Sequence, residues 1–228
     1  MNKIFLTGDT HIPIDVKKLN TRSFPEQKQL TRDDYLIVLG DFGLLWREDK
    51  EYYWWKQWFE AKRFTTLWLD GNHENHDWID SLPVSKWNGG KIHRISDNII
   101  HLIRGQVFTL AGKTFFVYGG AVSHDKEIRT PGVTWWTREE GSYQEECEAL
   151  DNLAVHNFQV DFILTHTCPD ELLQPMFHYN NILRSTTGKF LDHIAHTVSF
   201  KEWYFGHMHT DINYGKFHAR YNAITQIT

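Results

Sequence analysis

The chain has 228 residues, of which 41% are hydrophobic and 23% charged, and its formal net charge is −5. These values are typical of a globular protein, and the negative charge argues against an extended nucleic-acid footprint. The sequence has no apolar stretch of about 18 residues and only two cysteines, Cys147 and Cys168, so we expect a cytoplasmic protein without a membrane partner.

In chain order, the first part alternates short apolar runs with polar loops. Strands are predicted at residues 3–7, 35–39 and 65–69, and a helix at 51–64. This helix carries Tyr52, Trp55 and Phe59 on one face, which we interpret as a core-facing stripe. Residues 12–34 are polar, contain two prolines and show no clean period, so they predict an irregular loop with at most one helical turn.

The second part begins with short alternating strands between residues 84 and 120, including a hairpin of 106–110 with 114–118. A long loop at 122–136 follows. Thr137 and Glu140 fit a capping box, which predicts a helix to about His156. Its inward residues are expected to be Tyr143, Cys147, Leu150 and Ala154. The remaining predicted elements are strands at 161–164 and 201–205, a helix at 187–198, and a closing hairpin of 211–217 with 219–227. No linker or internal repeat interrupts the chain, so we expect one domain spanning residues 1–228.

Five of the predicted strands end in polar, chemically capable residues. In open α/β sheets, ligand sites assemble at the carboxyl ends of the strands, so these residues are expected to meet. They are Asp9 and His11; Asp41; Asn72 and His73; His166; and His207 and His209.

Imidazole and carboxylate ligands together suit Mn²⁺, Fe, Zn²⁺ or Ni²⁺ rather than a calcium cage. The candidates are too many for one tetrahedral zinc, but two ions could share them. Asp41, with two carboxylate oxygens, is the apt bridge between two ions. Such a pair lowers the pKa of a shared water and supports in-line phosphoryl displacement. A leaving oxygen then needs a proton or a positive neighbour, and His73 is placed to provide it.

The sequence resembles the calcineurin-like metallophosphoesterase superfamily. The resemblance runs from Asp9 to His209 through Asp9-Thr-His11, Gly40-Asp41, Gly71-Asn72-His73-Glu74, His166 and Gly206-His207-Met-His209. It implies an α/β fold, a four-layer αββα sandwich of two mixed β-sheets flanked by helices. It also implies two divalent ions, with manganese favoured and Fe, Zn, Ni or Mg as alternatives.

The resemblance implies a division of the ligands by motif position. One ion would be held by Asp9, His11, Asp41 and His209. The other would be held by Asp41, Asn72, His166 and His207. His73 would be the catalytic histidine, in contact with the phosphoryl group or the leaving oxygen.

One motif departs from the family pattern. Many family members, including the protein Ser/Thr phosphatases, continue the second motif with a further Asp and an Arg. Here residues 40–46 read Gly-Asp-Phe-Gly-Leu-Leu-Trp, so an expected phosphate-binding Arg is missing. We hypothesise that Arg129 or Lys126, in the long loop, binds the substrate phosphate instead. A surface loop with solvated charges explains these residues equally well.

The leading interpretation is a phosphoesterase that hydrolyses phosphomonoesters or phosphodiesters, with a small or nucleotide-type phosphodiester slightly favoured. The alternatives are a protein phosphatase and a non-catalytic scaffold of the same fold that binds a partner. A nuclease is disfavoured because the chain has no basic stripe. Glu74 is expected to lie outside the site, and the sequence does not indicate an oligomeric state.

Overall fold

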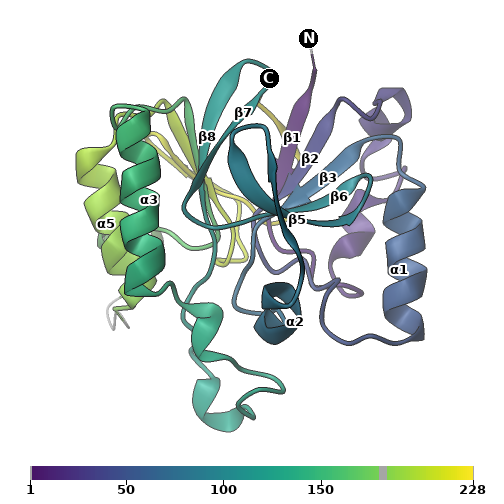
Figure 1. Cartoon of the computed structure of the whole chain (residues 1–228), viewed down its shortest axis with the longest axis horizontal. Helices are drawn as coiled ribbons and strands as arrows, with labels where there is room; N and C mark the ends of the chain where they lie inside the picture. Colours follow the sequence, from purple (N-terminus) through teal and green to yellow (C-terminus); the bar gives the residue numbers. More distant parts are fainter. Residues whose placement is uncertain (1, 180–183, 228) are drawn as a thin grey trace.

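The computed structural model describes residues 2–179 and 184–227, and two β-sheets form its centre (Figure 1). The strands of the first sheet are β1 (Ile4–Thr7), β2 (Tyr35–Val38), β3 (Thr65–Trp68), β4 (Val84–Trp87), β5 (Gly90–Ser96), β6 (Ile99–Leu102) and β13 (Thr225–Gln226). Those of the second are β7 (Gln106–Leu110), β8 (Lys113–Tyr118), β9 (Phe162–Thr165), β10 (Glu202–Phe205), β11 (Ile212–Tyr214) and β12 (Phe217–Ala219).

Both sheets are mixed, with parallel strands at the centre and antiparallel strands at the edges. The first has the order β13-β1-β2-β3-β6-β5-β4, in which β1, β2, β3 and β6 are parallel. The second has the order β11-β12-β10-β9-β8-β7, in which β12, β10, β9 and β8 are parallel. The parallel strands of each sheet therefore end at one common edge, where loops can gather ligands.

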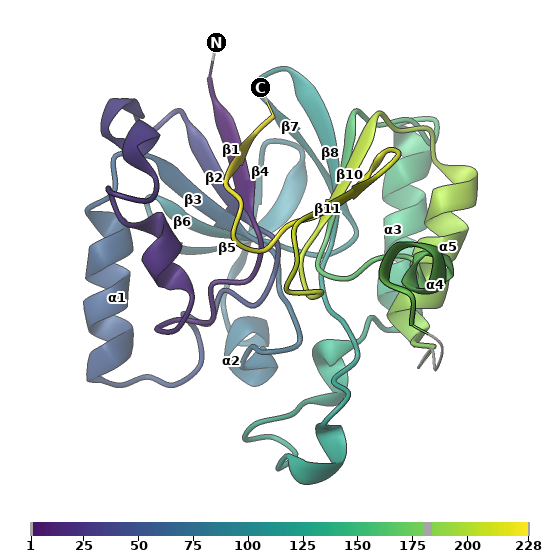
Figure 2. The ribbon, with the colours of Figure 1, turned by 180° about the vertical axis from the view of Figure 1, so that it is seen from behind.

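Helices cover the outer faces of the two sheets. The α-helices are α1 (Lys50–Glu60), α2 (His76–Asp80), α3 (Tyr143–Val155), α4 (Leu173–Phe177) and α5 (Thr186–Thr197). Helix α1 lies beside the first sheet, and α3, α4 and α5 lie beside the second (Figures 1 and 2). In the described part of the chain, no helix has both the length and the apolar character needed to cross a membrane.

Three apolar cores hold these layers together, and the middle one joins the sheets. Leu6 and Leu67 of the first sheet pack there with Phe115 and Leu164 of the second, all without solvent exposure. Burial of one such side chain contributes about 1.5–3 kcal/mol. One outer core lies between the first sheet and α1, and the other between the second sheet and α3–α5. The predicted αββα arrangement of two mixed sheets is confirmed.

The start of helix α3 was predicted wrongly. Residues Thr137–Glu139 form a short 3-10 helix, and α3 begins only at Tyr143. The observed capping box is formed by Ser142 and Glu145, whose carboxylate accepts a hydrogen bond from the Ser142 N–H at 2.8 Å. Glu140, the expected partner of Thr137, instead accepts a hydrogen bond from the Thr186 N–H at the start of α5, at 2.6 Å.

This shift changes which side of α3 faces the core. Ala149 and Leu153 are buried, and Leu150 packs against the same core as predicted. Tyr143 is 81% exposed, and Ala154 is also exposed, so both inward assignments were wrong.

Two further segments differ from the predictions. The segment 12–34 contains two 3-10 helices, Val16–Leu19 and Pro25–Gln29, rather than at most one helical turn. The closing hairpin is β11 with β12, turning at Gly215, which has a positive φ of 59°. The chain then leaves the second sheet, and β13 pairs with β1 in the first.

Candidate metal centre

The polar residues that follow the strands converge between the two sheets, at the carboxyl ends of their parallel strands. Asp9 and His11 follow β1, Asp41 follows β2, and Asn72 follows β3 of the first sheet. From the second sheet come His166 after β9, and His207 and His209 after β10. We refer to these seven residues as the ligand cluster: Asp9, His11, Asp41, Asn72, His166, His207 and His209.

The backbone of the cluster is bent to point these side chains inward. His11, Asp41, His207 and His209 all have positive φ values, of 33°, 47°, 62° and 46°. Non-glycine residues rarely adopt this region, and such residues gather at functional sites because the surrounding structure must hold them there.

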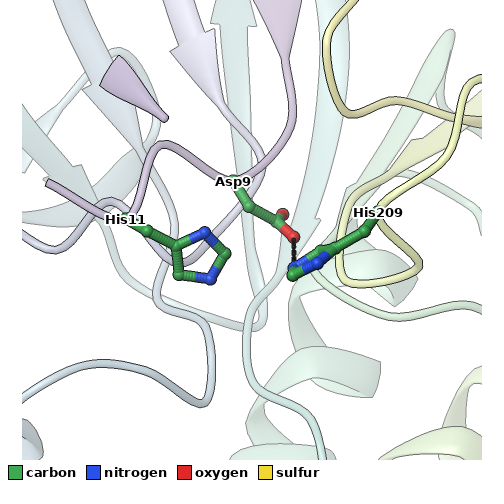
Figure 3. Close-up of side chains that lie close together, drawn as sticks. All are labelled: Asp9, His11 and His209. Carbon is green, nitrogen blue, oxygen red and sulfur yellow. Dashed lines mark ion pairs between the residues drawn. The ribbon is translucent and has the colours of Figure 1, made fainter. Parts of the chain in front are cut away.

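Asp9 is the centre of one side of the cluster (Figure 3). Its carboxylate is fully buried and lies 3.0 Å from Nε2 of His209. The backbone N–H of His207 donates to the same carboxylate at 3.0 Å. His11 lies on the other side of Asp9 in Figure 3, and the three residues can offer ligand atoms within 4.8 Å of one another.

Asp41 faces both sides of the cluster with its two oxygens. Oδ2 lies 3.1 Å from Nε2 of His11, while Oδ1 lies 3.4 Å from Nε2 of His166. Oδ1 also accepts a hydrogen bond from the backbone N–H of His73 at 2.7 Å. This arrangement suits a carboxylate shared between two ions.

Asn72, His166 and His207 make up the remaining part. Nδ1 of His166 lies 2.8 Å from the carbonyl oxygen of Leu39, and Nε2 lies 3.1 Å from Oδ1 of Asn72. The Asn72 amide donates to Oγ of Ser123 at 3.0 Å, which fixes its oxygen toward the cluster. Such outer partners orient metal ligands. Ser123 was missed from the sequence because it lies in a loop with no motif.

The two carboxylates are charged although they are buried. Burial acts to raise the pKa of Asp41, but His166 and His11 beside it hold that pKa well below its usual value. Burial also acts to raise the pKa of Asp9, but the hydrogen bond from His209 and the charge of His166 outweigh this effect and lower the pKa. For His166, burial lowers the pKa, but Asp41 and Asp9 raise it to about 9. Burial and His166 lower the pKa of His207 to about 3.

The donor set fits divalent metal ions. Three overlapping groups of side chains each bring their ligand atoms within 4.8 Å: Asp9, His11 and His209; His11, Asp41 and His73; and Asp41, His166 and His207. Among the described residues, no Lys or Arg side chain forms an ion pair with the carboxylate of Asp9 or Asp41, and histidines are the groups that pair with them. The ammonium of Lys18 contacts the backbone carbonyl of Asp9 rather than its carboxylate. Buried carboxylates of this kind require a proton or a metal cation nearby.

His73 lies close enough to the cluster to be a metal ligand, but the contact of Arg129 with its ring argues against that role. Nη2 of Arg129 lies 3.0 Å from Nε2 and 3.3 Å from Nδ1 of His73. A guanidinium donating to this ring competes with a metal cation for the same lone pair. Burial lowers the pKa of His73, with Asp41 opposing and Arg129 adding to the effect.

The loop residues proposed for phosphate binding are placed differently. Arg129 reaches His73, and Asp125 and Thr134 hold its guanidinium from behind at 2.8 and 3.2 Å. Lys126 is exposed, and its side chain forms no hydrogen bond or ion pair with any described residue. The loop that carries both projects away from the sheets on the side of α2 (Figures 1 and 2).

Two motif glycines are needed because residues of the ligand cluster approach them closely. A Cβ on Gly71 would lie 2.0 Å from Oδ1 of Asp41. A Cβ on Gly40 would lie 2.1 Å from Nδ1 of His166, and Gly40 also has a φ of 85°. Gly71 has no positive φ, so the close approach of Asp41 explains why this residue is a glycine.

Two further residues, Glu74 and Lys18, support the cluster. Glu74 is fully buried, accepts a hydrogen bond from the Phe42 N–H at 2.7 Å, and has a pKa that burial and Asp41 raise well above its usual value. It therefore fixes the loop that carries Asp41. The ammonium of Lys18 donates to the carbonyl oxygens of Gly8 and Asp9 at 2.9 and 2.7 Å and fixes the end of β1.

Comparison with known proteins agrees with this arrangement. A family model described as calcineurin-like phosphoesterase matches residues 2–211. The search of the curated proteins finds no match. Among solved structures, the chain is similar to phosphopantetheinyl hydrolase (PptH) from Mycobacterium tuberculosis, with 15% identity, a TM-score of 0.38, and coverage of 96% of this chain and 88% of that one. It is also similar to a putative 5'-nucleotidase from Staphylococcus aureus, with 14% identity, a TM-score of 0.46, and coverage of 96% and 48%.

Proposed function

The chain belongs to the calcineurin-like phosphoesterase family, and we propose that it hydrolyses small phosphate esters at a centre of two divalent metal ions. The family makes it a metal-dependent phosphoester hydrolase. Two ions, rather than one, are favoured by the seven-membered ligand cluster and by the two separate groups within it, Asp9 with His11 and His209, and Asp41 with His166 and His207. Manganese is the proposed metal, because mixed imidazole and carboxylate ligands suit it.

In this proposal Asp41 is shared between the ions. Asp9, His11 and His209 complete one ligand set. Asn72, His166 and His207 complete the other. The division is supported by the two oxygens of Asp41, of which one faces His11 and the other faces His166. When bound, the ions would lower the pKa of a water molecule and neutralise charge on the phosphate oxygens.

His73 and Arg129 would act on the phosphate ester itself. A neutral His73 ring can accept a hydrogen bond from Arg129 at one nitrogen and keep a proton on the other. That N–H can then donate to a phosphoryl oxygen or to the leaving oxygen. Arg129 has further N–H groups and a fixed positive charge, which would stabilise the phosphate.

The observation that carries the proposal is the convergence of two buried, charged carboxylates and four histidines from both sheets, without a Lys or Arg partner for either carboxylate among the described residues. A structural polar cluster would be expected to contain its own balancing charge.

The test is hydrolysis by protein treated with a chelator and then reloaded with Mn²⁺, Fe²⁺, Zn²⁺, Ni²⁺ or Mg²⁺. We expect chelation to abolish hydrolysis of bis(4-nitrophenyl) phosphate or 4-nitrophenyl phosphate, and Mn²⁺ to restore it. His73→Ala should keep its metal content and lose rate by about 10²–10⁴-fold. Folded protein without activity on either ester, with any of these ions, would favour a non-catalytic scaffold. Loss of both ions in His73→Ala would show that His73 is a ligand.

We also propose a single domain and a reducing compartment such as the cytoplasm. The two sheets share one core, which supports the first point. Cys147 and Cys168 are both free thiols, which supports the second.

A further inference from the structure

A groove of about 310 Å³ opens beside the proposed metal centre. His11 and His73 contribute to its lining, together with Trp46 from the β2–α1 loop and Tyr52 and Trp55 from α1. Its volume is in the range of small-molecule sites, about 300–1,000 Å³. Two side chains at the proposed centre, His11 and His73, line the groove. The organic group of a phosphate ester bound at the centre would therefore extend into it.

The aromatic walls of the groove are held in place by further aromatic rings. Each of the three wall residues has a ring from outside the groove lining packed against it. The pairs are Trp46 with Trp136 at 5.7 Å, Tyr52 with Trp78 at 4.9 Å, and Trp55 with Trp58 at 5.4 Å between ring centroids. Rings fixed in this way lose little conformational entropy when a ligand binds, so they favour a flat, rigid group.

The charges around the groove favour one polar contact rather than a polyanion. Arg47 lines the groove, is exposed, and has no hydrogen bond or ion pair with any described residue. The neighbouring acidic residues form other hydrogen bonds. The Asp49 carboxylate caps α1 by accepting a hydrogen bond from the Glu51 N–H at 2.9 Å, and the Glu48 carboxylate accepts one from the Tyr53 hydroxyl at 2.6 Å. Asp49 and Glu51 also line the groove and repel a second phosphate. Arg47 is therefore available to donate to one acceptor on the ligand.

Resting on the proposed phosphoesterase function, we propose that this groove binds the organic group of the phosphate ester. It would select a flat aromatic ring that carries a hydrogen-bond acceptor. Trp46, Tyr52 and Trp55 would contact the ring, and Arg47 would donate to its acceptor. A nucleobase and a simple aryl group share the flat ring, but only the nucleobase has the acceptor. A sugar or glycerol ester has neither.

The test compares three monoesters, adenosine 5'-monophosphate, phenyl phosphate and glycerol 2-phosphate, on the metal-loaded enzyme. Trp55→Ala should lower kcat/KM for the two aromatic esters by about tenfold, as stacking losses do, and leave glycerol 2-phosphate unchanged. Arg47→Gln should lower kcat/KM for adenosine 5'-monophosphate alone. Gln57→Ala is the matched control, because Gln57 is on the same helix, is exposed and does not line the groove.

Equal losses on all three esters in Trp55→Ala, or no loss on any, would overturn the groove assignment while leaving the phosphoesterase function intact. An equal effect of Arg47→Gln on phenyl phosphate and adenosine 5'-monophosphate would overturn the role of Arg47. Thermal melts of each variant exclude a folding defect.

Binding of adenosine provides a readout that does not depend on hydrolysis. Calorimetry should detect adenosine, which has no phosphate, on the metal-loaded wild type, and Trp55→Ala should weaken this binding about tenfold. Adenosine binding with this dependence in a protein that hydrolyses no ester would refute the proposed function and keep the groove. Absence of adenosine binding in an active enzyme would refute the groove assignment and keep the proposed function.

Discussion

The ligand cluster and a second buried polar cluster lie next to each other, and they differ in the source of their positive charge. The second, which we name the Asp70 cluster, consists of Asp70, His76, His93, His101 and Arg104, all buried. Asp70 comes only two residues before Asn72 of the ligand cluster. One cluster contains its own cation and the other does not.

The Asp70 cluster is balanced internally. Arg104 forms an ion pair with Asp70, and Nε2 of His101 lies 3.4 Å from the other Asp70 oxygen. Nδ1 of His93 lies 3.1 Å from Nδ1 of His101. Burial acts to raise the pKa of Asp70, but Arg104 holds it well below the usual value. This cluster needs no added ion.

In the described part of the chain, the carboxylates of the ligand cluster form ion pairs with histidines and with no Lys or Arg. The pKa of His166 is raised to about 9 because, against the effect of burial, Asp41 and Asp9 stabilise its charged form. A metal ion must displace such protons, since only neutral imidazole is a ligand. The comparison teaches that buried carboxylates with lowered pKa values and no Arg or Lys ion pair, as Asp9 and Asp41 are, mark a place for an external cation.

The first prediction tests the ligand cluster at its shared carboxylate. Asp41→Asn keeps the shape of the side chain but removes its charge. We expect both ions to be lost, and kcat/KM to fall by a factor on the order of a thousand, equivalent to several kcal/mol of metal stabilisation. Elemental analysis and hydrolysis assays measure the two effects. Retention of two ions by this variant would contradict the contrast between the two clusters, because metal binding would then not depend on the charge of Asp41.

The second prediction tests the Asp70 cluster. Arg104→Met leaves Asp70 buried without its cation, so the free energy of unfolding should fall by about 3–5 kcal/mol. Metal content should stay unchanged. Denaturant unfolding and elemental analysis measure these outcomes. The double variant Asp70→Asn with Arg104→Met is the control, and it should be more stable than Arg104→Met alone because no buried charge is left unpaired.

The third prediction concerns pH and His76. Burial lowers the pKa of His76 to about 4 from an ordinary value of 6.5; Asp70 and Asp80 oppose the shift, while Arg104 and Arg138 add to it. The unfolded chain therefore binds more protons between pH 6.5 and 4, so stability is full above pH 6.5 and falls as the pH decreases through this window.

The size of this loss is at most about 3 kcal/mol at pH 4, since one pKa unit corresponds to about 1.4 kcal/mol. Unfolding of His76→Gln should show a smaller decrease of stability between pH 6.5 and 4 than the wild type. Parallel curves for wild type and His76→Gln would contradict the assignment.

The same contrast explains what could be predicted from the sequence. The seven residues of the ligand cluster follow apolar strands closely, so their positions predicted that they would meet. The sandwich was expected from the resemblance of their motifs to a known family. His93 and His101 lie opposite each other in the antiparallel pair of β5 and β6, and Arg104 follows β6. His101 and Arg104 contact Asp70, and His93 contacts His101, only because the fold brings these distant residues together. The start of α3 was missed because two Ser/Thr–Glu pairs compete as caps, and the close packing of Gly141 against Tyr118 leaves no pattern in the sequence.

The last prediction concerns Arg129, the cation that contacts His73 beside the ligand cluster. Its guanidinium contacts His73 rather than Asp9 or Asp41, so it is not expected to balance the carboxylates. Asp125 and the Thr134 carbonyl hold it in place, which leaves it ready to bind a phosphate. Arg129→Ala should keep both ions and lower kcat/KM by about tenfold, as loss of one charged hydrogen bond does.

Lys126→Ala is the matched control, because it removes a positive charge from the same loop. Its side chain is exposed and unpaired among the described residues, so the variant should retain the wild-type rate. Equal losses in both variants would mean that the loop acts through its general charge, which salt would screen. Unchanged KM and kcat in Arg129→Ala would remove Arg129 from the site. A loss of metal in Arg129→Ala would instead show that this arginine supports the ligand cluster, and the distinction between the two clusters would become one of degree.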